Sequence, residues 1–321
     1  MTVAYAPVAE VVRNGFVEGV HFGAVAAFNA DGSTAFSVGD VNRPMHPRST
    51  NKVLQAAGMR ELGLVLNDEL LALSAASHWG ETYHVTGVRT LLASAALDES
   101  ALLTPPSLPE DPEARRQAIV AGQAPVPILH GCSGKHAAML ATCALRRWPT
   151  ASYLDPAHPL QQQLHALVER GSGEPIAHQA VDGCGAPAWT MSLTALANTY
   201  RQAVLASASS PLGAVAAAMR TYPQYVGGEH SEVTGLMRAV PGLLVKDGAE
   251  SVYAAALADG RAVAVKISDG GFRAGQAVLV AALRELGADD EVGANRQALA
   301  GWGEVPVLGH GQPVGVVRPI L

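Results

Sequence analysis

The sequence predicts an α+β fold in which one sheet is built from both ends of the chain and a helical region fills the middle. Short apolar runs separated by turn signals occur near the N-terminus and again after residue 241, as is typical of hairpin strands. Between them, apolar residues recur at helical spacing. A sheet covered by helices accounts for this order of elements. The expected boundaries are residues 1–321 for a single domain, about 1–48 and 241–321 for its sheet lobe, and about 49–240 for its helical region.

The N-terminal strands are expected as a hairpin over residues 23–28 and 34–38, because two short apolar runs flank the turn signal Asn29-Ala30-Asp31-Gly32. The middle of the chain is predicted as a series of helices, in each of which apolar residues lie three or four apart. These helices cover residues 53–62, 70–77, 85–96, 114–121, 135–148, 160–169 and 193–205. Two stretches rich in Pro or Ser, 104–112 and 206–213, are expected as loops.

The C-terminal part returns to short apolar runs separated by Asp-Gly turn signals, which is the pattern of hairpin strands. The expected strands cover residues 242–246, 251–257 and 262–268, with a last pair inside 305–317. A helix over residues 274–286 separates this last pair from the others. The sheet is therefore expected to receive strands from both chain ends.

Composition excludes several classes of partner. The formal net charge is −6 over 321 residues, and the lysines and arginines are scattered mostly singly, so no basic stripe suits nucleic acid. The longest apolar runs are far shorter than the roughly 20 residues that span a bilayer. The N-terminus lacks a basic region followed by an apolar core, and three cysteines make no disulfide framework. We expect a cytoplasmic protein with neither nucleic acid nor membrane as partner.

Two of the cysteines stand in Gly-flanked turns beside charged residues. Cys132 lies between Gly131 and Ser133 and is followed by a helical pattern, so it should stand at a helix N-terminus, where the helix dipole favours a thiolate. Cys184 lies between two glycines. This placement is compatible with a metal ligand or a reactive thiol. The alternative is that both cysteines are small core residues.

Ser49 and Lys52 form a Ser-x-x-Lys arrangement at the start of the first strong helix. Residues three apart share a helix face, so the hydroxyl and the amine can meet, and a lysine that loses its proton can activate a serine. The alternative is that Ser49 only caps the helix.

A second serine and a second lysine offer a similar pair. Ser77 precedes His78 at the end of an apolar helical stretch, where a turn containing Gly80 could expose its hydroxyl. The alternative is a helix C-terminus capped by that glycine. Lys246 ends a predicted strand, a placement similar to the Lys-Thr-Gly strand of serine β-lactamases. A solvated hairpin lysine is the alternative there.

Together these segments resemble the bacterial rhizobial-type L-asparaginases, nearly from end to end. The resemblance depends on the order and number of several short motifs. They are Pro47-Arg48-Ser49 with Lys52 and Gln55, Ala76-Ser77-His78 with Gly80-Glu81, Cys132 to Ala137, Asp182 to Pro187, Tyr225 to Gly228, and Lys246 with Gly248-Ala249-Glu250. Two positions depart from the family pattern: Gly131 stands where Asn is common, and Trp79 where a small residue is common.

The resemblance implies a fold like that of the serine β-lactamases and glutaminases, with a mixed sheet flanked by helices, and a homodimer. It implies zinc as the cofactor and two Ser-Lys pairs as the catalytic groups. The implied roles are Ser49 with Lys52 and Ser77 with Lys246 as the pairs, Cys132, Lys135 and Cys184 as the zinc ligands, and Asp182, His136 and Arg48 as substrate-binding residues. Two thiolates and one neutral amine leave a fourth zinc position open, as such a site requires.

The implied function is the hydrolysis of L-asparagine to L-aspartate and ammonia through an acyl-enzyme. Ser49 is the preferred nucleophile and Lys52 its base, while Ser77 and Lys246 relay protons; Ser77 stays the alternative nucleophile. A serine hydrolase of another amide, such as glutamine or a lactam, would use the same pairs. A zinc-binding scaffold without catalysis is the other alternative, against which the intact Ser-Lys pairs argue.

Overall fold

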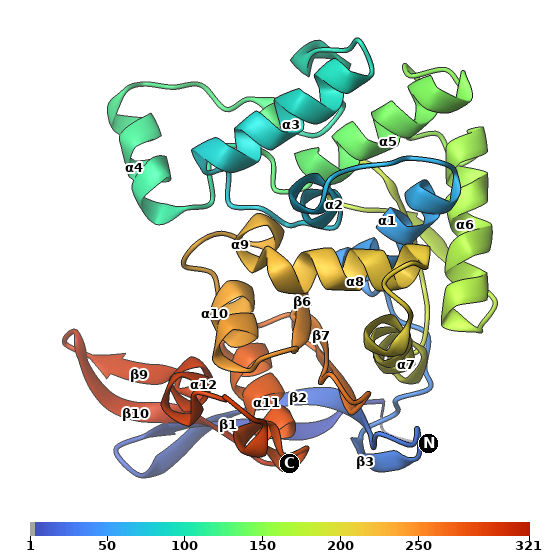
Figure 1. The fold of residues 1–321 in the computed structure, drawn as a ribbon. Helices are drawn as coiled ribbons and strands as arrows, with labels where there is room; N and C mark the ends of the chain where they lie inside the picture. Colours follow the sequence, from blue (N-terminus) through green and yellow to red (C-terminus); the bar gives the residue numbers. More distant parts are fainter. Residues whose placement is uncertain (1–3) are drawn as a thin grey trace. The chain divides into compact units, whose positions relative to one another are not determined.

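The computed structural model describes residues 4–321, which divide into a sheet unit and a helical unit (Figure 1). The sheet unit contains the chain up to Thr50 together with Thr190–Leu205 and Gly235–Leu321. The helical unit contains Asn51–Trp189 and Ala206–Thr234. Each unit therefore draws on segments that are far apart in the sequence.

The sheet unit holds an eight-stranded sheet in which every pairing of the described strands is antiparallel. Its order is β6-β7-β8-β2-β1-β10-β9, with β3 paired to β2. The bounds are β1 Ala6–Arg13, β2 Phe16–Phe28, β3 Thr34–Val38, β6 Leu244–Gly248, β7 Val252–Ala256, β8 Ala262–Ile267, β9 Pro306–Gly309 and β10 Gln312–Pro319. Val11 of β1 lies opposite Val317 of β10, so the two chain ends meet inside one sheet. The predicted construction from both ends is confirmed.

Helices of the sheet unit cover its strands. The helix α7 (Leu193–Leu205) packs on β2, β7 and β8, and α11 (Phe272–Glu285) packs on β1, β7, β8 and β10. All five residues of β7 are buried, which is the pattern of a strand covered on both faces. The helix α12 (Arg296–Gly303) packs on α11, and η4 spans Ala288–Asp290. The helix α10 (Glu232–Ala239) begins in the helical unit and ends in the sheet unit.

The helical unit is arranged around α5 (Ser133–Arg146), which contacts α1, α2, α3 and α6. Its other elements are α1 Lys52–Glu61, α2 Asp68–Ser74, α3 Thr82–Ser94, α4 Pro112–Val120, α6 Pro159–Ser172, α8 Pro211–Thr221, α9 Pro223–Val226, the short helices η2 Glu99–Ala101 and η3 Pro127–Leu129, and the hairpin β4 Gln179–Val181 with β5 Pro187–Trp189. Every residue of α5 from Ser133 to Cys143 is buried. Polar residues in its first turn therefore lie inside the protein, where each needs a partner or a function.

The α+β class and the predicted helices and hairpins are confirmed, but three details differ. The sheet is antiparallel in every described pairing, whereas the resemblance implies a mixed one, because its neighbouring strands are joined by hairpins or brought together from the two chain ends. The sequence analysis did not predict β1, which lies between β2 and β10. Residues 206–213 are not wholly a loop, since Ser210 accepts a hydrogen bond from Gly213 N and Pro211 begins α8. Among residues 4–321, no helix has both the length and the apolar character needed to cross a bilayer.

Candidate active site

Ser49 of the sheet unit lies in a tight turn, the short helix η1 (Arg48–Asn51) that leads directly into α1. The preceding residue, Arg48, has a φ of 53°, in the left-handed region that non-glycine residues rarely adopt. Thr50 fixes the turn, since its N–H and its hydroxyl both donate to Pro47 O, at 3.3 and 2.7 Å. The buried Tyr200 hydroxyl donates to Thr50 O at 2.9 Å. The backbone around Ser49 is therefore held in a strained, fixed conformation.

The end of β6 approaches the same turn closely. A Cβ on Gly248 would lie 3.0 Å from Pro47 O and 3.1 Å from Ser49 N, so a side chain there would push the strand and the turn apart. Lys246 lies two residues earlier on the same face of the strand and is fully buried. Its Nζ donates to Asp247 O at 2.9 Å and also contacts Asp247 Oδ1. The sheet unit thus places Ser49 next to the strand that carries Lys246.

Arg48 lies at the partly exposed side of this turn. Its guanidinium is 3.9 Å from the Glu250 carboxylate, and the two side chains are 22% and 60% exposed. A pair this open to water contributes about 0–1 kcal/mol to stability. The predicted substrate-binding role of Arg48 stays a prediction.

In the helical unit, the buried Lys52 side chain joins Ser77 to Cys132. Its Nζ donates to Ser77 Oγ at 3.0 Å, to Cys132 Sγ at 3.2 Å and, over a short distance, to Ala76 O. An ammonium has three N–H donors, so these contacts use all of them. The lysine of the Ser-x-x-Lys segment is therefore in direct contact with the hydroxyl of the second predicted serine.

Cys132 lies at the N-cap of α5, as the sequence predicted. A hydrogen bond with the Cys184 side chain, and the positive charges of Lys52 and Lys135, hold the pKa of Cys132 well below its usual range in spite of burial. The third cysteine differs, since burial raises the pKa of Cys143 to about 12. Cys132 therefore has the environment of a thiolate, while Cys143 has that of a core residue.

Cys184, Lys135 and His136 complete the buried cluster. Lys135 Nζ donates to Cys184 Sγ at 3.3 Å. Burial acts to lower the pKa of Lys135, but the charges of Cys184, Cys132 and Asp182 outweigh it and raise the pKa to about 12. Burial lowers the pKa of His136 to about 4. These groups bring the positive and negative charges of the cluster together inside the protein.

His136 carries a buried nitrogen that protein groups leave unsatisfied. Its Nδ1 lies 2.7 Å from the Tyr153 hydroxyl, whereas its Nε2 makes no hydrogen bond of normal geometry with any described residue. The ring is near enough to Cys184 for that side chain to act on its pKa, so this nitrogen faces the sulfur cluster. A buried, unsatisfied nitrogen is expensive unless something else binds it.

The turn between β4 and β5 positions Cys184. Asp182 N donates to Ala186 O and Gly185 N donates to Asp182 O, both at 2.9 Å. The Asp182 carboxylate accepts from Gly183 N at 2.8 Å, and its charge acts on Lys135. The turn therefore presents a sulfur and a carboxylate to the same lysine.

Backbone hydrogen bonds fix the segment that carries Ser77 from two sides. Ser77 N donates to Val226 O at 2.9 Å, and Trp79 N donates to Gly227 O at 2.8 Å. His78 N donates to Gly131 O at 2.9 Å. The Ser77 hydroxyl is thus positioned by loops that lie about 50 and 150 residues further along the chain.

His78 is buried as a neutral ring. Its Nε2 lies 2.8 Å from Ser133 Oγ, and Ser133 in turn donates to Ile128 O, so the His78 Nε2–H is the donor. Its Nδ1 accepts from Gly80 N at 3.2 Å. Burial, together with the neighbouring His84, lowers the pKa of His78 well below its usual range. His78 therefore supports the turn and the start of α5 without carrying charge.

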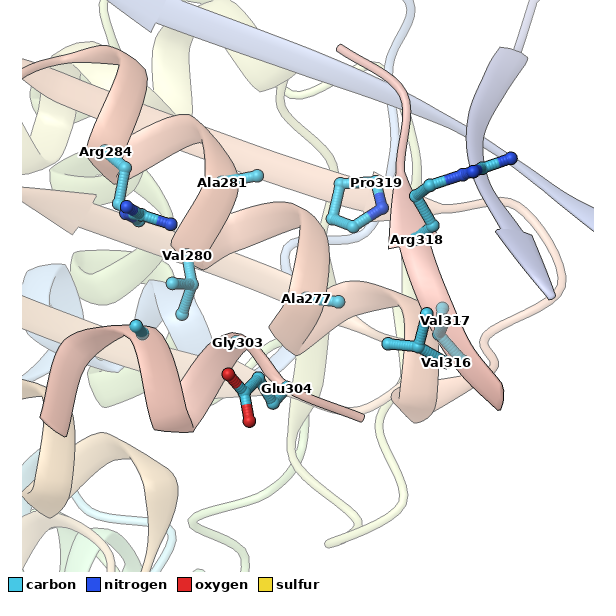
Figure 2. A pocket seen from close by; sticks show the side chains of 11 residues that line it. Ala277, Val280, Ala281, Arg284, Gly303, Glu304, Val316, Val317, Arg318 and Pro319 are labelled. Carbon is cyan, nitrogen blue, oxygen red and sulfur yellow. The ribbon is translucent and has the colours of Figure 1, made fainter. Parts of the chain in front are cut away.

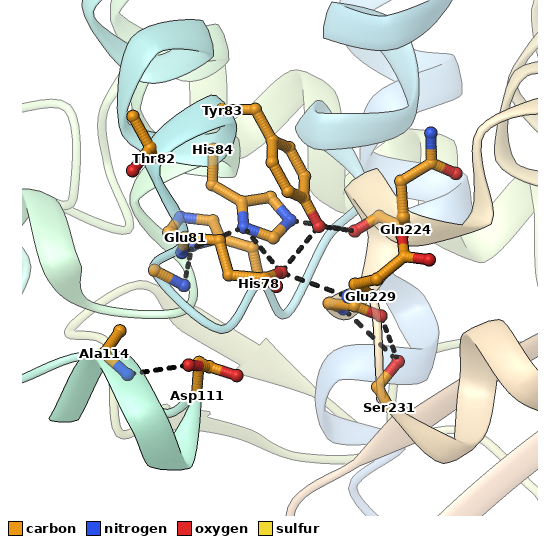
Figure 3. A network of polar contacts seen from close by, with 12 residues as sticks. His78, Glu81, Thr82, Tyr83, His84, Asp111, Ala114, Gln224, Glu229 and Ser231 are labelled. Atoms are coloured by element: carbon orange, nitrogen blue, oxygen red, sulfur yellow. Dashed lines mark hydrogen bonds and ion pairs between the residues drawn. The ribbon is translucent and has the colours of Figure 1, made fainter. Parts of the chain in front are cut away.

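Figure 3 shows the polar network that joins this segment to the loop before α10. Glu81 accepts from the Tyr83 hydroxyl at 2.5 Å and from Glu229 N at 3.1 Å. His84 Nδ1 accepts from Glu81 N at 3.2 Å, and His84 Nε2 donates to Gln224 O at 2.9 Å. These hydrogen bonds connect the start of α3 to α9 and the loop after it, the carbonyls of which also accept from Ser77 N and Trp79 N.

Within residues 4–321, no three side chains of His, Cys, Asp or Glu gather as a metal site. The donors that do gather are the sulfurs of Cys132 and Cys184 and the amine of Lys135, with His136 Nε2 beside them. Thiolates and nitrogen donors are the ligands that zinc prefers. These residues could hold such an ion.

A pocket in the sheet unit, shown in Figure 2, is lined by none of these groups. It has a volume of about 330 Å³ and is lined by aliphatic residues with Arg284, Glu304 and Arg318. The two arginines also contact carboxylates outside the pocket lining, Asp289 at 2.7 Å and Glu10 at 2.5 Å. The pocket contains no predicted catalytic residue.

Sequence reasoning missed the aromatic residues that support the site. Tyr200 holds the Ser49 turn. The Tyr153 hydroxyl contacts His136 Nδ1 and accepts a hydrogen bond from Leu103 N at 3.1 Å. Each is a single aromatic residue within an apolar or irregular stretch, so no spacing marked it. Only the three-dimensional contacts reveal these roles.

Comparison with known families supports an amide hydrolase. A family model described as L-asparaginase II matches residues 9–319, so the chain belongs to the L-asparaginase II family. The resemblance inferred from the sequence motifs is confirmed. No curated protein sequence matches the chain.

Two solved structures illustrate the fold neighbours. A β-lactamase from Mycobacterium bovis is 15% identical, with a TM-score of 0.39, over 82% of this chain and 94% of that one. A Bacillus glutaminase is 12% identical, with a TM-score of 0.37, over 83% of this chain and 91% of that one.

Proposed function

We propose that the protein hydrolyses the side-chain amide of L-asparagine to L-aspartate and ammonia through a serine acyl-enzyme. Membership of the L-asparaginase II family supports the amide substrate. The observation that carries the serine chemistry is the buried Lys52 side chain, whose Nζ lies 3.0 Å from the Ser77 hydroxyl and which follows Ser49 by three residues. Once this side chain has lost one proton, its neutral amine can accept the proton of a serine.

Ser49 is the proposed nucleophile. Its hydroxyl oxygen attacks the amide carbon while its proton passes to the Lys52 amine, and the C–N bond then breaks as the leaving nitrogen receives a proton. Water then attacks the ester, which releases aspartate and restores the hydroxyl. The fixed turn around Ser49 supports this role, because its geometry is set before substrate binds.

Ser77 and Lys246 are proposed to relay protons and to stabilise the developing charge. The hydrogen bond from Lys52 to Ser77 gives a proton path between the lysine and the second serine. Lys246 is buried, and a buried ammonium stabilises a nearby oxyanion more strongly than one in water.

Zinc is the proposed cofactor, held by Cys132, Lys135 and Cys184. The fit depends on two buried sulfurs and a buried amine in contact, and on the unsatisfied His136 Nε2 beside them. When bound, the ion would supply positive charge that orients polar groups of the substrate. Lys135 must lose its proton to bind a metal, so the zinc occupancy of the site should fall as pH drops.

Arg48, Asp182 and His136 are proposed to orient the substrate. Arg48 offers a partly exposed guanidinium that suits a carboxylate. Asp182 offers a carboxylate that already attracts Lys135, and His136 offers a neutral ring at the same cluster.

A cytoplasmic homodimer stays our expectation, and light scattering of the purified protein tests the size of the assembly.

The experiment that tests the proposed function compares ammonia release from L-asparagine, L-glutamine and a β-lactam by the zinc-supplemented protein. We expect asparagine to give the highest kcat/KM. Glutamine or the lactam as the better substrate would favour the rival serine hydrolase. If none of the three substrates is hydrolysed while zinc is bound, the result would favour the alternative of a zinc-binding scaffold without catalysis.

A further inference from the structure

The Pro-rich segment before α4 brings one carboxylate to the Ser77 segment. Glu110 N and Asp111 N both donate to Trp79 O, at 2.8 and 3.0 Å. Trp79 follows Ser77 by two residues, and its own N–H is held by Gly227 O. Two hydrogen bonds to one carbonyl fix the backbone of Glu110 relative to Ser77, although the two residues are 33 positions apart.

The side chain of Glu110 extends toward the start of α5. A Cβ built on Gly131 would lie 3.3 Å from Glu110 Oε1 and 3.0 Å from His78 O. Gly131 immediately precedes Cys132, the sulfur of which accepts from Lys52. The absence of a side chain at Gly131 therefore provides the space in which the Glu110 carboxylate lies beside the residue that precedes Cys132.

His130 lies between Glu110 and the start of α5 in sequence, since it directly precedes Gly131. His130 Nδ1 accepts from Cys132 N at 3.0 Å, so this ring touches the cluster directly. Glu110 itself is exposed, whereas Lys52, Lys135 and both sulfurs are buried. Glu110 therefore lies at the solvent side of the cluster.

An amino acid amide presents one cation, its α-ammonium, which needs a carboxylate partner. Lys52 and Lys135 suit negative or polar oxygens, and Asp182 is already attracted to Lys135. We propose that Glu110 is a specificity-determining residue that binds the α-ammonium group of the substrate. This inference rests on the proposed function, since it concerns the substrate of the same site.

The test removes the charge from the residue and the ammonium from the substrate. Glu110→Gln is compared with Glu113→Gln, a matched loss of charge three residues along, where the carboxylate pairs with Arg116 on α4. The substrates are L-asparagine and succinamic acid, which keeps the amide and the carboxylate but lacks the α-ammonium. Circular dichroism and zinc content serve as checks on folding.

We expect Glu110→Gln to raise KM for asparagine by roughly 10- to 100-fold with little change in kcat. The reason is that the α-ammonium of the substrate would be buried on binding without its carboxylate partner. Its kinetics with succinamic acid should stay those of the wild type, and Glu113→Gln should change neither substrate. Equal losses for both substrates, or no change for asparagine, would overturn the inference and leave Asp182 as the better candidate.

A binding measurement separates this inference from the proposed function. Calorimetry compares L-aspartate with succinate, which again differ by the α-ammonium, on the wild type and on Glu110→Gln. We expect the wild type to prefer aspartate and the variant to lose that preference. If no amide is hydrolysed, the proposed function fails, yet a lost preference still supports Glu110 as the ammonium partner; an unchanged preference rejects that role.

Discussion

At the scale of single residues, the chain combines two serines with three fully buried lysines and two buried sulfurs. A buried charge is costly unless other groups compensate it. Lys52 is compensated by Ser77 Oγ, Cys132 Sγ and Ala76 O, and Lys135 by Cys184. Such clusters are more typical of functional sites than of cores, because a core gains nothing from them. These contacts support the proposal that the serines carry the chemistry and that the sulfurs bind the metal.

Ser49→Ala should lower kcat by about a thousandfold or more, because it removes the proposed nucleophile. Folding and zinc content should be unchanged, since no proposed ligand is altered. Ammonia release with saturating asparagine measures the loss. Turnover close to that of the wild type would transfer the role to Ser77, and Ser77→Ala is the companion variant that shows this.

Cys184→Ala should release the zinc and raise KM more than it lowers kcat, since the serines and lysines form a complete acyl-transfer set. Elemental analysis should find about one zinc ion per wild-type subunit and none in the variant. Steady-state kinetics then compare the two proteins. Loss of kcat in a well-folded, zinc-free variant would instead assign the chemical step to the metal.

At the scale of elements, close backbone contacts set the positions of the reactive groups. Gly248 lets the end of β6 reach the Ser49 turn, and Gly131 lets the start of α5 lie against His78 O. The start of α3 is fixed by the network of Glu81, Tyr83 and His84 shown in Figure 3. Adding a side chain at Gly248 and replacing the His84 ring should therefore each disturb the site without changing a reactive group.

Gly248→Ala tests the first contact. The new methyl would lie 3.0 Å from Pro47 O and 3.1 Å from Ser49 N, so the strand or the turn has to move. We expect the free energy of unfolding to fall by about 1–3 kcal/mol, as for other overpacked sites. We also expect kcat to fall while the zinc content changes less. Urea unfolding and kinetics check both. The φ of this glycine is not in the left-handed region, so steric contact is the only cause; normal activity would show that the contact does not position Ser49.

His84→Gln tests the network through its pH dependence. Burial lowers the pKa of His84 to about 4 from 6.5, so the folded state resists protonation that the unfolded chain accepts. The stability of the wild type should therefore be complete above pH 6.5 and fall as pH drops from 6.5 toward 4, by up to about 3 kcal/mol from this residue. His78 and His136 add to the same slope. Chemical denaturation at several pH values should show a shallower fall in the variant; an equal slope would mean that His84 does not titrate in this way.

At the scale of the whole molecule, the sequence predicted the order of helices and hairpins well because apolar spacing repeats within each element. It missed β1, since the residues from Ala6 to Arg13 mix apolar residues with Pro7, Glu10 and a terminal arginine. It also took the start of α8 for a loop, because Ser and Pro signal both turns and helix starts.

The sequence motifs proposed residues for the candidate site but did not indicate the contacts between them. The motifs indicated Lys52 as the partner of Ser49, whereas the hydrogen bond from Lys52 to Ser77 joins residues 25 apart, which no local spacing can indicate. The place of Glu110 depends on a glycine and on a carbonyl from two other segments. Contacts of this kind follow from tertiary packing, not from periodicity.

The central claim is that the amide is cleaved through an ester on Ser49, and trapping that ester tests it most directly. The protein is mixed with L-asparagine, quenched in acid within the first turnover, and analysed by mass spectrometry of the intact chain and of its peptides. We expect one added aspartyl group, located on Ser49 and absent from Ser49→Ala. An adduct on Ser77, or steady ammonia release with no adduct on any serine, would contradict it.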